Sequence, residues 1–316
     1  MMVMAKIGIG LFLAILLEIG IEQVYMHTAR YRGSLGGAWN FRKNVPKQLE
    51  IVNIGSGPGL YGITYEFCQK RGFNFSTAPQ NYNYGFRLLK RFSDNLCADC
   101  IIIIIIMCPL SFGNNAEYSK PGYADRFYGI LPPEEIDGYS VWRAWLLRHP
   151  LLKKTLEKWK TGVSLAASRC RKSGKKAGGP AAEPGVVGIW KQEFQLKNLT
   201  DASQSENHRI AFDEKLRILQ EGIAYCHVKG WRPVFVTPPV PPETRACIGE
   251  EFLQAFVYDN LKELQNQYPW IPLLDYYGDS RFEASMFQND IFVNQVGRQR
   301  FSEILFHDIA EHFSED

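Results

Sequence analysis

The sequence has little net charge, and this excludes one broad class of partners. Its 316 residues include 36 lysines and arginines against 33 aspartates and glutamates, which leaves a net charge of +3. A protein that binds nucleic acid usually presents a basic face interleaved with aromatic side chains. No stretch of this kind occurs in the sequence, so we expect no nucleic-acid partner.

Cysteine is also sparse and does not form a recognisable pattern. The seven cysteines are odd in number and irregularly spaced, unlike those of a disulfide-stapled domain. Cys97 and Cys100 have the spacing of a zinc or redox pair, but no second pair or histidine completes such a site. We interpret both as structural thiols and expect no metal.

The glycine-rich segment Gly55–Gly59 lacks the features of a nucleotide-binding loop. No Gly-Lys-Ser/Thr follows it, and its three glycines do not have the dinucleotide spacing. Pro58 also removes one backbone N–H that a phosphate cradle would use. We therefore expect neither a nucleotide nor any other cofactor.

The most informative stretch that is present is Ile101–Met107, six consecutive isoleucines followed by a methionine. It is too short for a membrane helix, and β-branched residues favour strands. A strand without polar alternation is typical of the centre of a parallel α/β sheet, which is covered on both faces. Ligands bind beyond the carboxyl ends of such strands, so Cys108–Gly113 should border the functional site.

Shorter apolar segments alternate with segments of helical length along the rest of the chain. This order predicts an α/β fold, a flavodoxin-like three-layer sandwich with a five-stranded parallel sheet of order 2-1-3-4-5. The first and third strands would then bring Gly55–Gly59 beside Cys108–Gly113. The expected strands are 50–55, 73–77, 100–107, 232–238 and 271–275, and the expected helices are 60–71, 84–96, 206–229, 250–267 and 296–313.

Residues 1–25 are expected to form an N-terminal transmembrane helix. Met1–Ile21 spans roughly 30 Å as a helix, enough for a bilayer if Lys6 and Glu18 reach toward the interfaces. No small-residue cleavage site follows, which favours an uncleaved anchor over a signal peptide. The alternative is a buried N-terminal helix. We expect a single-pass protein with an extracytoplasmic domain, although the basic residues after the anchor favour the cytoplasmic side.

The remaining residues, 26–316, are expected to form one α/β domain with two inserted regions. Residues 126–167 are rich in tryptophan and predict either a helical cap or a plain surface hairpin, broken at His149-Pro150. Residues 168–185 combine basic side chains with glycine, alanine and proline. Such a composition does not bury enough surface to fold, so this region is predicted to be a flexible basic linker.

Four short blocks follow the expected strands in a recognisable order. They are Asn53–Gly59, Phe73–Phe75 with Gln80, Cys108–Phe112, and Asn289–Gly297. Together they resemble the SGNH (GDSL-like) hydrolase superfamily, especially its membrane-anchored bacterial envelope branch, from about residue 49 to 313. The resemblance implies a pocket lined by Gly55, Ser56, Gln80, Cys108, Ser111 and Asn294.

The chain departs from this family at the catalytic positions. The resemblance places the family's nucleophilic serine at Gly57, its aspartate at Asn289 and its general-base histidine at Phe292. Acyl transfer of this type needs a hydroxyl beside an imidazole that a carboxylate orients. Ser56 and Asp290 are the neighbouring substitutes, but a shift by one residue usually turns a side chain to another face.

The loss of all three positions predicts a catalytically inactive protein. We expect it to bind or scaffold a cell-envelope polysaccharide or an acyltransferase partner while anchored in the membrane. The alternative is an active esterase or O-acyltransferase on carbohydrate esters that uses Ser56 and a base elsewhere in the chain.

Overall fold

The computed structural model describes residues 16–42, 44–107, 111–113, 120, 122–158, 185 and 206–314. The chain divides into two compact units, each made of two separate stretches. Met1–Trp39 and Ala124–Pro180 form one, called here the helical unit. Asn40–Tyr123 and Ala181–Asp316 form the other, called here the α/β unit.

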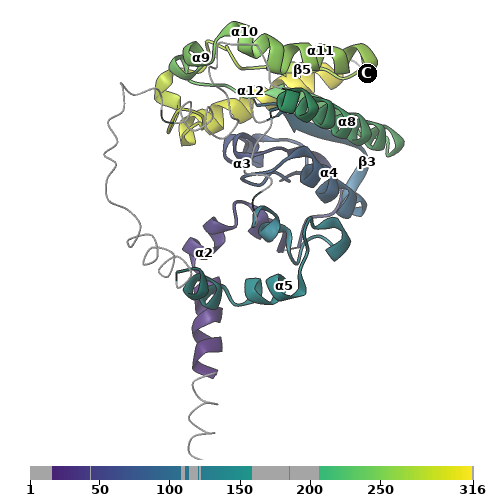
Figure 1. The fold of residues 1–316 in the computed structure, drawn as a ribbon. Coiled ribbons are helices and arrows are strands. Elements are labelled where there is room, and N and C mark those ends of the chain that lie inside the picture. Colours follow the sequence, from purple (N-terminus) through teal and green to yellow (C-terminus); the bar gives the residue numbers. More distant parts are fainter. Residues whose placement is uncertain are drawn as a thin grey trace, which may run out of the picture. The chain divides into compact units, whose positions relative to one another are not determined.

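The α/β unit is built on a five-stranded sheet (Figure 1). Its strands are β1 (Leu49–Ile54), β2 (Gly72–Asn74), β3 (Leu96–Ile105), β4 (Arg232–Thr237) and β5 (Leu273–Asp275). Their order is β2-β1-β3-β4-β5, and every neighbouring pair is parallel. The predicted α/β class, the strand order and the central place of the isoleucine run are confirmed.

The isoleucine side chains of β3 are buried on both faces of the sheet. Ile101 pairs with Ile51 of β1 and Arg232 of β4, and each isoleucine from 101 to 105 is at most 3% exposed. Side chains alternate along a strand, so Ile101 and Ile103 share one face and Ile102 the other. Full burial of one such side chain contributes about 1.5–3 kcal/mol, which explains why this strand lies in the middle.

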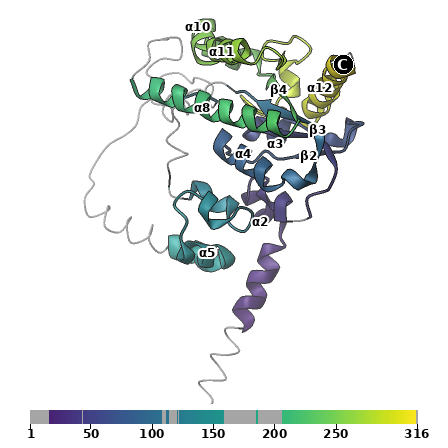
Figure 2. The ribbon, with the colours of Figure 1, turned by 90° about the vertical axis from the view of Figure 1, so that its right-hand side faces the viewer.

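Helices cover the two faces of the sheet as distinct sets (Figure 2). On one face, α12 (Gln295–Ser314) contributes Phe301 and Leu305 to the cluster that contains Ile101 and Ile103. The short helix α3 (Gly57–Gly62) packs on α12 there. On the other face, α4 (Tyr82–Arg91) lies against Ile54 of β1 and against α8 (Glu206–Val228). Further helices of the described residues are α2 (Ala29–Ser34), α5 (Val141–Arg148), α9 (Pro242–Ile248), α10 (Glu250–Leu253) and α11 (Asp259–Gln267).

The helix predicted over 60–71 is wrong. Only α3 forms, from Gly57, followed by a 3₁₀ turn at Tyr65–Phe67, and Gly72 begins β2 instead of ending a helix. The hydroxyl of Tyr65 donates to the Asn53 side chain at 2.8 Å and so turns the chain back early. A methyl group on Gly72 would lie 1.9 Å from the Tyr65 ring, so this glycine makes room for the ring.

Two other predicted helices have different bounds. The one over 84–96 begins at Tyr82 and ends at Arg91, because a 3₁₀ turn follows and Asn95 donates to the carbonyl of Val45 at 2.8 Å. The one over 250–267 is interrupted by a π-helical turn at Gln254–Tyr258. Such turns insert one residue into a helix and leave no periodic signal in the sequence.

In the helical unit, a buried glutamate joins two helical stretches. Residues 16–26 and 150–158 are helical, with the predicted break at His149 between α5 and the second stretch. Glu22 is 3% exposed, and its carboxylate accepts the N–H groups of Leu151 at 3.1 Å and Leu152 at 3.3 Å. Its second oxygen lies 2.9 Å from Nδ1 of His149. Glu22 therefore caps the start of the second stretch, where a negative charge is favourable.

Several sequence expectations fall outside the described residues. They are the first fifteen residues of the anchor, residues 159–167 of the predicted cap, and the linker 168–185 except Gly185. Among the helices that the structure does describe, none is long and apolar enough to cross a membrane.

Candidate functional site

The carboxyl ends of β1 and β3 meet through a close backbone contact at Gly55. This residue has φ +146°, and a methyl group on it would lie 2.7 Å from Cβ of Ile105. Its N–H donates to Oε1 of Gln80 at 2.7 Å, while Nε2 of Gln80 donates to the carbonyl of Phe75 at 2.9 Å. Gln80 thus ties the end of β1 to the segment that follows β2.

A small cavity of about 20 Å³ lies at this point, called here the switch-point cavity. Its lining is Gly55, Ser56, Gln80, Asn81, Tyr82, Ile105, Met107, Ser111 and Lys215. The structure therefore brings together Gly55, Ser56, Gln80 and Ser111 from the predicted pocket. Cys108 lies outside the described residues, and Asn294 lines a different groove.

Both serines of the switch-point cavity accept hydrogen bonds from the backbone. Oγ of Ser56 accepts the N–H of Gln80 at 3.4 Å, and Oγ of Ser111 accepts the N–H of Met107 at 2.6 Å. Lys215 reaches the same cavity from α8, and sequence reasoning missed it. Burial lowers the pKa of its ammonium group, with a smaller opposing effect from Glu214.

Gly57 and Phe292, where the resemblance places the nucleophile and the base, lie side by side. A methyl group on Gly57 would be 2.6 Å from Cζ and 2.7 Å from Cε1 of Phe292. The Phe292 ring also contacts Tyr61 edge-on, with centroids 5.2 Å apart. Asn289 orients the turn, because its Oδ1 accepts the N–H groups of Ile291 at 3.0 Å and Phe292 at 2.8 Å. The Phe292 ring therefore lies against the backbone of Gly57, and neither residue supplies a hydroxyl or an imidazole.

The neighbouring substitutes do not come together. Ser56 lines the switch-point cavity, whereas Asp290 does not, and the carbonyl of Asp290 accepts the Thr244 hydroxyl at 2.7 Å. The described imidazoles of the α/β unit lie elsewhere. His227 is at the end of α8 beside Trp270, and His307 and His312 are in the last part of α12. Those helix ends adjoin the amino end of the sheet, where Arg232 of β4 stacks on Phe313.

Tyr61 also lines an open groove of about 370 Å³, which is called here the aromatic groove. Its lining is Tyr61, Thr64, Glu66, Phe67, Gln288, Val293, Asn294, Gln295, Arg298 and Gln299. Tyr61 is 40% and Phe67 39% exposed. Asn294 has a structural role there, since its side chain accepts the N–H of Gly297 at 3.1 Å and donates to the Ser285 carbonyl at 2.7 Å.

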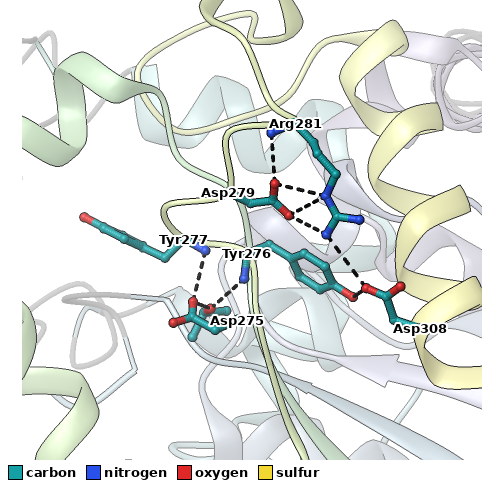
Figure 3. A network of polar contacts seen from close by, with 7 residues as sticks. Asp275, Tyr276, Tyr277, Asp279, Arg281 and Asp308 are labelled. Carbon is teal, nitrogen blue, oxygen red and sulfur yellow. Dashed lines mark hydrogen bonds and ion pairs between the residues drawn. The ribbon is translucent and has the colours of Figure 1, made fainter. Parts of the chain in front are cut away.

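A polar network holds the loop after β5 against α12 (Figure 3). The Tyr276 hydroxyl donates to Asp308 at 2.7 Å, and Arg281 donates to both carboxylate oxygens of Asp279. Asp275 accepts the N–H of Tyr277 at 3.0 Å and the hydroxyl of Thr237. Burial, helped by the bond to Asp308, raises the pKa of Tyr276. The network fixes the loop that leads toward Asn289, and we assign it a structural role.

The cysteine pair and one group of potential ligands complete the description. Cys97 and Cys100 are both free thiols, and Cys100 is buried in β3, where burial raises its pKa. Ligand atoms of His307, Asp308 and Glu311 lie within 4.8 Å of one another on α12. Asp308, however, already accepts the Tyr276 hydroxyl, so this group has a structural explanation.

Among the described residues, the switch-point cavity offers hydroxyls, amides and an ammonium group, and the aromatic groove offers exposed rings, amides, Glu66 and Arg298. Gly57 and Phe292 themselves provide no hydroxyl, carboxylate or imidazole for acyl transfer. A comparison of the chain with models of known protein families and with curated protein sequences finds no match.

Proposed function

We propose that this chain is a membrane-anchored, SGNH-hydrolase-like protein that has lost acyl transfer and binds a cell-envelope glycan. The observation that carries the proposal is the contact between Gly57 and Phe292. A methyl group on Gly57 would be 2.6 Å from the ring, so the ring fills the space that a nucleophilic side chain needs. The parallel sheet of order 2-1-3-4-5 and the meeting of these two positions support the family assignment.

The aromatic groove supports a glycan as the ligand. Exposed rings such as Tyr61 and Phe67 stack on the apolar C–H faces of sugars, and the amides of Gln288 and Gln295 can hydrogen-bond to sugar hydroxyls. Pockets for small ligands enclose about 300–1,000 Å³, and the groove, with about 370 Å³, falls in that range.

The helical unit supports the membrane part of the proposal. Its helical stretch at 16–26 exposes Leu17 by 66% and Val24 by 70%, and α5 exposes Val141 by 76% and Trp142 by 61%. Exposed apolar side chains in one unit favour a lipid or protein neighbour over water. The apolar sequence before residue 16 continues this character.

Glycan binding is tested by calorimetric titration of the full chain in detergent with chito-oligosaccharides and with alginate, a neutral and an acidic probe. Tyr61→Ala and Phe67→Ala should each weaken binding about tenfold, because each removes a stacking ring. Trp270→Ala is the matched control, since this ring is also exposed, by 46%, but lies outside the groove. Equal weakening by all three variants, or no binding of either probe, would refute the glycan; an acyltransferase partner would then be the remaining candidate.

Loss of catalysis is tested with a serine-directed fluorophosphonate probe, which should leave Ser56 unlabelled. The competing function, an esterase or O-acyltransferase that uses Ser56, is favoured by one observation. Lys215 lines the same cavity and has a lowered pKa, as a lysine base would need. Labelling of Ser56, with turnover abolished by Ser56→Ala, would establish the enzyme and overturn the proposal.

A further inference from the structure

We propose that the switch-point cavity is an oxyanion-binding site that takes a carboxylate or phosphate group, with Lys215 as its cation and Ser56 and Ser111 as hydroxyl donors. The site is separate from the aromatic groove. The proposal does not depend on glycan binding in that groove, and it gives Lys215 a role in ligand binding.

The hydrogen bonds of the two serines point to donation into the cavity. A hydroxyl has one proton and two lone pairs, and in both serines a backbone N–H already occupies a lone pair. The proton of each hydroxyl must therefore point away from that N–H. Within the described part of the chain, neither hydroxyl donates to a protein acceptor. Two donors are thus available to a ligand at the same cavity.

The remaining lining adds positive charge and no negative charge. None of its nine described residues is an aspartate or glutamate, and Lys215 brings an ammonium group. Gln80 is held in place at the cavity, because its Oε1 accepts the N–H of Gly55 and its Nε2 donates to the carbonyl of Phe75. Asn81 and Tyr82 mark the start of α4, a ten-residue helix whose dipole places partial positive charge there. This lining offers hydrogen-bond donors and positive charge, which an oxyanion matches and a cation does not.

The size of the cavity limits what can enter it. A volume of about 20 Å³ holds one group the size of a water molecule, by the usual requirement of about 10–15 Å³. The cavity therefore fits one oxygen of a small free anion or of the acidic end of a longer ligand, the rest of which stays at the mouth of the cavity. Ser56, Asn81 and Lys215 are all partly exposed, so such a group can reach it from solvent. Its position between the ends of β1 and β3 is where open α/β sheets bind ligands.

The ammonium group of Lys215 gains from an anion. Burial lowers the pKa of Lys215, because it disfavours the charged form of the ammonium group. An oxyanion in contact would favour the charged form through a charge-assisted hydrogen bond. The same contact would bring the pKa of Lys215 back up, which distinguishes anion binding from a neutral catalytic lysine.

The test is calorimetric titration of the full chain with inorganic phosphate and, separately, acetate, at constant ionic strength set by sodium chloride. The two arms distinguish a phosphate from a carboxylate ligand. Lys215→Met should weaken binding about tenfold or more, Lys215→Arg should retain most of it, and Ser56→Ala should weaken it a few-fold. Lys262→Met is the control, because this lysine is exposed on α11 and away from the cavity.

A second measurement on the unaltered protein does not depend on a variant that folds. Acetic anhydride modifies lysines, and mass spectrometry reports each site. The bound anion should protect Lys215 and leave Lys262 unprotected. Equal affinity of Lys215→Met and the unaltered chain, or no protection of Lys215 by either anion, would overturn the proposal.

Discussion

Gly57 and Phe292 approach so closely that one methyl group tests the geometry of the site. Gly57→Ala should destabilise the protein by about 1–3 kcal/mol, because the added group meets the ring within 2.7 Å. In a Phe292→Ala background the loss should shrink, since the ring is gone. Urea unfolding of the four proteins in a double-mutant cycle measures this coupling. Gly33→Ala is the control, because open space surrounds that glycine, and an identical loss in both backgrounds would contradict the contact.

Asp279 makes the stability of the loop after β5 depend on pH. The hydrogen bonds from Arg281 lower the pKa of Asp279 below its unfolded value of about 3.9. The stabilisation is therefore present above about pH 4 and lost as the pH falls through the folded value. Asp279→Asn should flatten the decrease of Tm in acid. The effect should stay below about 1 kcal/mol, because Arg281 is 45% exposed.

Arg281→Gln supplies the matched test of this pair. It removes the hydrogen-bond donor and should reduce the decrease of Tm in acid as Asp279→Asn does. The double variant should show no further reduction. Thermal unfolding followed between about pH 5 and 2 provides the comparison. If the Tm of Asp279→Asn decreases in acid as much as that of the unaltered protein, other carboxyl groups cause the decrease.

Residues of the site differ in how far the sequence could place them. Ser56 lies just after β1 and Ser111 lies in the loop after β3, and adjacent parallel strands end at one edge, so their meeting was predictable. Lys215 was not, because a lysine in the middle of a helix is usually solvated. Its place at the cavity depends on how α8 packs on α4, where Gly222 lets the Phe86 ring approach. Asn294 was assigned to the same pocket but caps α12 instead.

At the scale of elements, β3 was predictable and α3 was not. Six isoleucines allow only a strand covered on both faces, and the structure has that strand in the centre. The glycines near α3 permitted two interpretations. Gly72 was expected to end a helix, whereas it provides space for the Tyr65 ring. A sequence shows that a glycine is present but not whether the backbone conformation or the missing side chain matters.

Glu22 provides a prediction for the joined helical stretches. Glu22→Ala should free the N–H groups of Leu151 and Leu152, raise their hydrogen-exchange rates and cost about 0.5–2 kcal/mol, as for other lost helix caps. Glu22→Gln keeps an acceptor and should have a smaller effect. Glu18→Ala, an exposed glutamate one turn earlier, is the control. Unchanged exchange at both amides in Glu22→Ala would show that the carboxylate does not hold this turn.

For the whole molecule, the exposed apolar surface of the helical unit is the feature on which the proposed membrane location depends. The rings of Trp142 and Trp145 stack at 4.8 Å on α5, and the Trp145 ring contacts His149 at the same centroid distance. His149 in turn lies beside Glu22 on the 16–26 stretch. The tryptophan pair is therefore attached to the helix that continues the apolar N-terminal sequence. Tryptophan at the end of an apolar span is typical of the membrane–water interface.

The last prediction follows from this attachment. In the full chain reconstituted into vesicles, lipids brominated near the headgroup should quench the fluorescence of Trp142 and Trp145, because interfacial indole rings lie at that depth. Replacing both by phenylalanine should remove that part of the quenching while the apolar character of α5 is kept. Trp270→Phe is the control, since this exposed ring belongs to the α/β unit. If the double variant is quenched as strongly as the unaltered protein, or if Trp270→Phe loses as much quenching, α5 does not lie at the interface and the lipid assignment of this surface fails.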